Sequence, residues 1–101
     1  MASRITDSHR RGLLFPIGAL IFSEGIDGLI RQGRLDPIPF FQRHTRGDWG
    51  DVSDHKWQEN NAALKSSARL DSFYVVTRDL KICVFTEADR SATHIVLPSE
   101  Y

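Results

Sequence analysis

Very little in this sequence marks it out for a known chemistry. Cysteine occurs once among the 101 residues, at Cys83, which excludes an internal disulfide and a zinc site built on several cysteines. Cys83 stands in an apolar run, so we predict a small buried core residue rather than a nucleophile. An excess of one charge is also lacking, because thirteen Lys and Arg residues balance thirteen Asp and Glu residues. This balance argues against the basic excess of most nucleic-acid binders and against an acidic mimic of DNA.

Long apolar runs are missing as well. Residues 13–21 form an apolar stretch near the N-terminus, but it is too short to span a bilayer and contains Pro16 and Gly18. It has no small-residue cleavage site of the kind that ends a secretory signal. We therefore predict a soluble, cytoplasmic protein without a membrane contact. The sequence also lacks Gly-rich phosphate-binding fingerprints and a nucleophile elbow, and we predict no cofactor.

The length of the chain predicts a single domain, because domains typically contain about 100–150 residues. Residues 1–12 are polar and aperiodic, which indicates a flexible N-terminal tail, and residues 13–101 are predicted to form the domain. A domain of this size buries roughly 60–70% of its unfolded surface, so its stability is modest and a homodimer contact would increase it.

The first half of the domain predicts a short strand and about three helices. Residues 19–22 (ALIF) fit a short buried strand, after which Ser23 caps a helix that ends at Gly33. Asp36-Pro37 is typical of a second helix start, with Asp as the cap and Pro in the first turn. A third helix is predicted over residues 54–66.

The third helix has an unusual stripe of side chains. Ser53 or Asp51 can cap this helix by accepting hydrogen bonds from its first N–H groups. One stripe at helical spacing then combines apolar and amide side chains: Trp57, Asn60, Asn61 and Leu64. Buried amides need hydrogen-bond partners, so we predict that at least one Asn satisfies backbone groups, with those of the loop before the helix as candidates.

From Leu70 onward the apolar period of the sequence changes to two, which is typical of strands. Strands are predicted at residues 70–77, 80–86 and 93–97, with a tight turn at Arg78-Asp79. Three sequential strands with short connections form an antiparallel meander. The predicted fold class is therefore α+β: a short N-terminal strand and about three helices, followed by a three-stranded antiparallel meander.

The stretch RHTRGDWGDVSD, residues 43–54, has no apolar periodicity and predicts a tight loop, which we call the glycine loop. Gly47 and Gly50 allow backbone angles that other residues avoid. Trp49 is a large apolar ring within this polar turn, so we predict that it packs the loop onto the core.

Two motifs give the chain a resemblance to a protein family. They are RHxxGDWGD at residues 43–51 and TEADRSAT at residues 86–93. Together with further matches such as LPSEY at residues 97–101, they make the chain from about Gly18 to its end resemble a family of small bacterial proteins carried on plasmids, integrative elements and phages. The family usually has Trp in place of Cys83 and a second Thr in place of His94.

The resemblance implies a mobile-element accessory protein of unknown biochemistry. Members of the family sometimes carry the label type I restriction endonuclease subunit M. A methyltransferase subunit needs a cofactor-binding α/β domain and a catalytic Asn/Asp-Pro-Pro-aromatic motif, and this chain has room for neither.

The polar residues of these motifs are the candidate binding residues: Arg43, His44, Asp48, Trp49, Asp51, Asn61, Glu87, Asp89 and Arg90. We predict a non-enzymatic module that binds an unidentified protein partner, with modulation of a host defence or replication component as its task. The predicted binding surface is a polar one, built from the glycine loop and the turn at residues 87–90. In this interpretation Asp48 and Arg90 form internal hydrogen bonds and leave a flat, exposed aromatic patch.

A small metal-assisted or acid–base hydrolase or nuclease is the first alternative. It would use His44, Asp48, Glu87 and Asp89, converging in a concave pocket. Against it, Asp residues beside glycines are more often turn formers and helix caps, and we assign neither a catalytic residue nor a metal site. The segment 87–90 is then a charge-paired turn whose Arg90 clamps the carboxylates of the glycine loop.

A weak nucleic-acid-binding module is the second alternative. It requires the cations Arg43, Arg46, Lys65 and Arg69 to share one face of the molecule.

Overall fold

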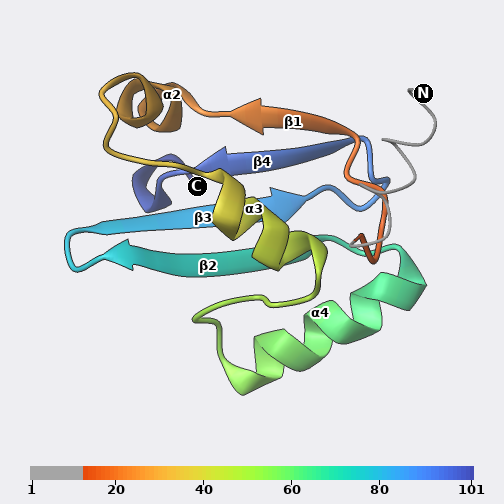
Figure 1. Ribbon diagram of the computed structural model, residues 1–101. Coiled ribbons are helices and arrows are strands. Elements are labelled where there is room, and N and C mark those ends of the chain that lie inside the picture. Colours follow the sequence, from red (N-terminus) through yellow and green to blue (C-terminus); the bar gives the residue numbers. More distant parts are fainter. Residues whose placement is uncertain (1–12) are drawn as a thin grey trace.

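The computed structural model describes residues 13–101, and the predicted tail at residues 1–12 lies outside the described residues. The elements follow one another as β1 (Ala19–Phe22), α2 (Glu24–Arg31), α3 (Ile38–Thr45), α4 (Asp54–Ser66), β2 (Leu70–Thr77), β3 (Leu80–Thr86), β4 (Ala92–Val96) and the 3₁₀ turn η1 (Pro98–Glu100). The predicted α+β class is confirmed (Figure 1). Within residues 13–101, no helix is long and apolar enough to cross a membrane.

The four strands form one sheet in the order β1-β4-β3-β2. The predicted antiparallel meander is confirmed for β2, β3 and β4. The first strand corrects the prediction, because β1 lies beside β4 and runs parallel to it, so that the sheet is mixed. The prediction of a buried strand is also wrong here, because β1 is an edge strand and only Leu20 of its four residues is partly buried. Parallel neighbours need a long crossover, and the whole chain between β1 and β4 supplies it.

Two of the three helices begin at their predicted caps, Ser23 and Ser53, whereas Pro37 rather than Asp36 occupies the N-cap position of α3. The side chains of Ser23, Asp36 and Ser53 each accept a hydrogen bond from a backbone N–H of the first helical turn, at 3.2, 3.1 and 3.0 Å. Gly33 follows α2 with a φ of +69°, as expected of the glycine that ends a helix. The glycine loop is shorter than predicted, because its first three residues complete the last turn of α3.

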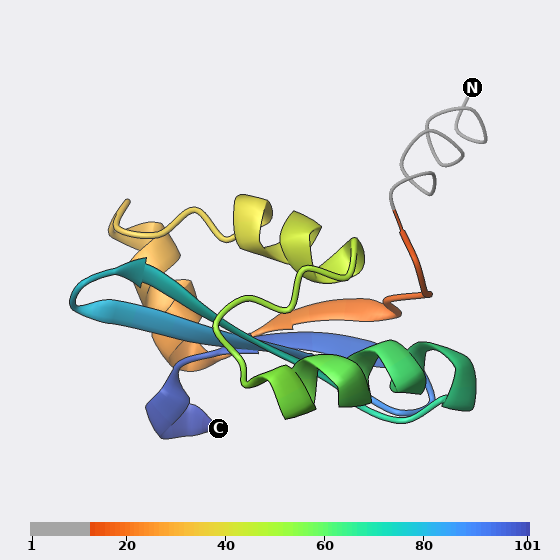
Figure 2. The same cartoon turned by 90° about the horizontal axis from the view of Figure 1, so that it is seen from below.

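Figure 2 shows α3 on one side of the sheet and η1 on the other. We call the side opposite α3 the open face. On the α3 side, Leu70, Ser72 and Tyr74 are buried while the residues between them are not, as the period of two predicts. The main core cluster consists of Ile26, Leu35, Phe41, Tyr74, Ile82, Val84 and Ile95. A second cluster contains Phe15, Trp49, Ala63 and Leu70, which confirms that Trp49 packs the glycine loop onto the core.

The glycine loop runs along the outer edge of β2 and pairs with its backbone. The N–H of Phe73 donates to the carbonyl of Trp49 at 3.1 Å, and the N–H of Asp51 donates to the carbonyl of Phe73 at 2.7 Å. Gly50 lies between these two bonds with a φ of +78°, and a Cβ atom placed there would lie 2.1 Å from the carbonyl oxygen of Phe73. Only glycine therefore allows the loop to approach the strand this closely.

This close approach predicts that Gly50→Ala lowers the free energy of unfolding by about 2–4 kcal/mol, from left-handed backbone strain together with displacement of the loop. Chemical denaturation of the purified protein measures the change. The matched control is Gly28→Ala inside α2, where a Cβ would meet no atom within 4 Å. That substitution should stabilise the protein by about 0.5–1 kcal/mol, because alanine favours a helix over glycine. Equal effects of the two substitutions would contradict the proposed role of Gly50.

Candidate functional site

The charged residues of the glycine loop are paired with each other. Arg43 donates from Nε to Oδ2 of Asp48 at 2.7 Å and from Nη2 to Oδ1 at 3.3 Å. Asp48 Oδ1 also accepts the N–H of Gly50 at 3.1 Å, and the carbonyl of Asp48 accepts the hydroxyl of Tyr74 at 2.7 Å. The hydrogen bond from Arg43 is the main reason that the pKa of Asp48 lies below its usual value. Asp48 therefore holds the loop in shape.

His44 is buried in a chain of hydroxyl groups. Its Nδ1 lies 2.6 Å from Ser72 Oγ and its Nε2 lies 2.9 Å from Thr86 Oγ1. Thr86 is in turn 2.7 Å from Thr93, whose hydroxyl donates to the carbonyl of Ile17 at 2.9 Å. A carbonyl only accepts, so the direction of every bond follows from this end of the chain. Thr86 donates to Thr93, His44 donates from Nε2–H to Thr86, and Ser72 donates to Nδ1.

This arrangement holds the imidazole of His44 in its neutral form. Burial lowers the pKa of His44 to about 3, because the charged form would lose its hydration. The single lone pair of the ring is used by Ser72, and the side chain is fully buried. His44 thus links α3 to β2 and β3 and has no accessible nitrogen for a substrate.

The two Asn residues of the predicted stripe have different environments. Asn60 is buried, donates to the carbonyl of Asp71 at 2.7 Å and accepts its N–H at 3.1 Å. This confirms that one Asn satisfies backbone groups, although these belong to β2 rather than to the glycine loop. Asn61 is exposed, which corrects its predicted core-facing position, and its Oδ1 accepts the indole N–H of Trp49 at 3.0 Å.

Arg90 binds carbonyl groups, and the predicted clamp on the carboxylates of the glycine loop is wrong. The guanidinium donates to the carbonyls of Ala68 at 2.6 Å and Ala63 at 2.9 Å, and at longer range to those of Glu87 and Ala88. A cation at this position also interacts favourably with the partial negative charge at the C-terminal end of α4. Arg90 therefore ties the end of α4 to the turn between β3 and β4.

The two acidic residues of the TEADRSAT motif have separate partners. Glu87 lies 2.8 Å from Nε2 of His94, and Asp89 accepts the N–H of Ser91 at 2.9 Å within its own turn. The four residues of the hydrolase alternative thus each have a different partner. In the described part of the chain, no group of three His, Cys, Asp or Glu side chains is arranged to hold a metal ion.

Aromatic side chains and an arginine gather instead on the open face. The Arg69 guanidinium lies 3.9 Å from the ring centre of Phe85 and 5.2 Å from that of Tyr101. His94 stacks against Phe85, with ring centres 4.6 Å apart and planes 16° apart. Together with Phe73, which shares this face by strand alternation, these residues form what we call the open-face cluster. No local sequence pattern identifies these residues as a group, because they become neighbours only through the register of the strands.

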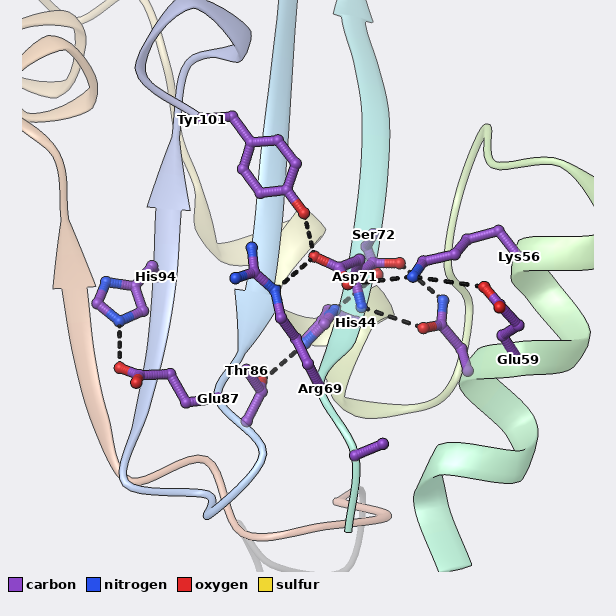
Figure 3. A network of polar contacts seen from close by, with 12 residues as sticks. His44, Lys56, Glu59, Arg69, Asp71, Ser72, Thr86, Glu87, His94 and Tyr101 are labelled. Carbon is purple, nitrogen blue, oxygen red and sulfur yellow. Dashed lines mark hydrogen bonds and ion pairs between the residues drawn. The ribbon is translucent and has the colours of Figure 1, made fainter. Parts of the chain in front are cut away.

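Asp71 fixes the cluster at its centre. Figure 3 shows Arg69, Tyr101 and Lys56 converging on its carboxylate. Arg69 Nε lies 3.0 Å away, Lys56 Nζ lies 3.2 Å away, and the Tyr101 hydroxyl donates to Oδ1. Burial alone would raise the pKa of Asp71, but the hydrogen bonds from Tyr101 and Arg69 and the contact with Lys56 outweigh it, and the pKa is lowered.

A pocket of about 310 Å³ opens on the same face beside the cluster. Its lining is mainly apolar and comes from the loop before α4, from α4 itself, from β2 and β3, and from the C-terminal end: Val52, Lys56, Asp71, Ser72, Phe73, Cys83, Pro98 and Tyr101. Cys83 is buried, as predicted, and burial raises the pKa of its thiol. The pocket has the size of a small ligand or of one large side chain of a partner protein.

No family model, curated protein or solved structure matches this chain. The resemblance to mobile-element proteins therefore stays a prediction, and the function has to be argued from the geometry of the described residues.

The burial of neutral His44 predicts a stability that falls on acidification. Its folded-state pKa of about 3 lies below the ordinary value of 6.5, so the unfolded chain binds the proton more readily. This contribution to stability is complete above pH 6.5 and is lost progressively as the pH falls from 6.5 toward 3. Between pH 7 and pH 5 the free energy of unfolding should fall by about 2 kcal/mol on this account.

The His44→Gln variant checks this prediction in urea denaturation at each pH. Its stability at pH 7 should be lower, but its loss between pH 7 and pH 5 should be smaller than that of the wild type by about 2 kcal/mol, because glutamine does not titrate. Ala62→Gln, at an exposed position on α4, is the control and should keep the wild-type pH dependence, because it neither adds nor removes a titrating group. A wild-type slope in His44→Gln would rule out His44 as the titrating group.

Proposed function

We propose that the protein is a non-enzymatic interaction module that serves a bacterial mobile element in the cytoplasm and binds a host protein through the open face. The observation that carries this proposal is the open-face cluster beside an apolar pocket. Arginine and aromatic residues are enriched at the centres of protein interfaces, where an anchor side chain of one partner fills a pocket of the other.

The charges around the pocket support a protein ligand with an apolar anchor. Asp71 is neutralised by Arg69 and Lys56, so a partner does not have to desolvate an unpaired carboxylate there. The ring of Tyr101 lies at the rim, where it offers a large contact area with few rotatable bonds. A partner that inserts one Leu, Met or Phe side chain into the pocket would place its own polar groups near Arg69 and Lys56.

The motif residues support a binding role over a catalytic one. Asp48 is engaged by Arg43, His44 is buried and neutral, and Arg90 is bound to carbonyls. These groups maintain the scaffold that presents the open face, and a hydrolase would need at least one of them free to meet substrate.

The placement of the cations gives little support to nucleic-acid binding. Arg43 lies over the ring of Tyr74, on the α3 side of the sheet. Arg69 lies over Phe85, on the open face. These two cations cannot follow one phosphate backbone together, and the net charge of the chain is zero.

The proposal predicts that Tyr101→Ala weakens capture of a specific host protein by at least about tenfold, the effect of losing one interface hot spot. Quantitative affinity capture from a bacterial lysate should compare wild-type and variant baits, and titration of the purified partner should then give the ratio of dissociation constants. Leu14→Ala is a matched control, because Leu14 is 57% exposed and Tyr101 is 60% exposed. Leu14 lies outside the open-face cluster, so its substitution should leave binding unchanged.

Two results would contradict the proposal. One is a captured protein that binds wild-type and Tyr101→Ala baits equally. The other is a hydrolytic activity of the purified protein that disappears in Asp48→Asn while the variant remains folded.

A further inference from the structure

The two edges of the sheet differ sharply in how their backbone groups are bonded. On β2, the outward N–H and C=O groups of Asp71 are both bonded by Asn60, and those of Phe73 are bonded by the glycine loop. The N–H of Val75 donates to Asp51 Oδ2 at 3.3 Å. This edge is closed to any further strand.

The other edge, on β1, has outward backbone groups without a partner in the described residues 13–101. Ala19 and Ser23 donate to the carbonyls of Ser91 and Ile95, so the odd-numbered residues of β1 face β4. In a parallel pair the intervening residues point their N–H and C=O groups the other way, which applies to Leu20 and Phe22. Among residues 13–101, no hydrogen bond reaches those outward groups.

β1 also lacks the devices that usually protect an edge strand. Its sequence, ALIF, contains no charged residue and no proline, and the four residues pair in register without a bulge. Its side chains are apolar and all but Leu20 are exposed, with Ile21 43% and Phe22 36% accessible. Figure 1 shows β1 as the border of the sheet, with α2 beyond its end rather than along its outer side. An open, apolar, uncharged strand edge recruits another strand.

We propose that β1 pairs antiparallel with β1 of a second copy of this chain, about a two-fold axis that passes through Ile21. In this register Leu20 of each copy faces Phe22 of the other, and each such pair exchanges both backbone hydrogen bonds. Four intermolecular bonds thus satisfy every outward group of β1. The two Ile21 residues form the central non-hydrogen-bonded pair and pack against each other on the open-face side of the sheet.

The geometry of β1 favours a second copy over a strand of another protein. The two outward-facing residues lie symmetrically about Ile21, which is the condition for a self-complementary, isologous contact. Moving the axis by one residue toward the N-terminus would bring Gly18 into the ladder opposite Phe22, but its φ of +63° is not extended. Moving it the other way would bring in Glu24, which belongs to α2. The absence of charge on β1 means that no like charges meet across the axis.

Cysteine cross-linking tests the register directly, with the full chain in a Cys83→Ala background. Ile21→Cys should give an intermolecular disulfide under mild oxidation, since the Cα atoms of such a central pair lie about 4.5 Å apart, within disulfide range. Ala19→Cys is the matched control on the same face of the same strand. Its two copies would lie about 13 Å apart along the strands and should remain uncrosslinked. Equal cross-linking of both variants, or of neither, would overturn the proposed pairing.

Sedimentation velocity of the unmodified chain tests the association itself, over concentrations from about 1 μM to about 500 μM. The wild type should shift from monomer to dimer in this range, and Ile21→Lys should raise the dissociation constant by at least about tenfold, because two like charges would meet at the axis. Val75→Lys is the control, since Val75 is also 43% exposed but lies on the closed edge, and it should dimerise as the wild type does. A chain that is monomeric throughout, or a dimer that only Val75→Lys disrupts, would refute the proposal.

The proposed dimer and the proposed partner site can be tested independently of each other. Tyr101 is outside β1, and Ile21 is outside the open-face cluster. Tyr101→Ala should lose capture of the host protein but still dimerise. Ile21→Lys should lose dimerisation but keep the partner site, so each result reports on one surface.

Discussion

The structure depends on closing the outer edge of β2. A strand that faces the core on one side leaves its outward N–H and C=O groups in need of partners, and unpaired buried groups of this kind are costly. The glycine loop and Asn60 supply those partners. Gly50 is required because the loop comes too near to Phe73 for any side chain, and the bidentate pair of Arg43 and Asp48 holds the loop in that conformation. The most distinctive motif in the sequence is thus explained by backbone hydrogen bonding.

Other polar residues that resemble catalytic groups in the sequence also serve to hold the fold together. His44 lies within a hydroxyl chain that crosses β2, β3 and β4, and Arg90 binds the carbonyls at the end of α4. Each of these networks joins elements that are distant along the chain. In a small domain with a limited apolar core, fully satisfied polar networks specify one arrangement of the elements over its competitors. The open face differs in that it also carries the aromatic rings of the open-face cluster and the apolar pocket.

The parts of the fold that sequence predicts are those governed by neighbouring residues. Helix caps at Ser23 and Ser53, the turn at Arg78-Asp79 and the period of two in the meander are all local effects. The parallel pairing of β1 with β4 and the partners of Arg90 depend on contacts across most of the chain, and no local pattern encodes them. The open-face cluster was beyond prediction for a related reason: Phe85 and His94 become neighbours only once the register of β3 and β4 is known. The exposure of Asn61 does not follow from the helical period, because positions three and four residues after Trp57 lie on the same side of a helix. The packing of α4 against β2 decides that Asn60 is the buried amide.

The proposed dimer contact at β1 and the open face have a geometric relation that bears on partner binding. Pairing through β1 about an axis normal to the sheet keeps the open faces of both copies on the same side, because the two Ile21 side chains point the same way. The resulting continuous sheet would present two pockets and two open-face clusters to one partner surface. A partner with two matching anchors would then bind more tightly overall, because the first contact raises the effective concentration of the second anchor at its pocket. The contacts within each pocket would stay the same. In the proposed dimer, such bivalence would allow a small domain to bind firmly through two modest contacts, with the edge at β2 covered by the glycine loop and the edge at β1 used for pairing.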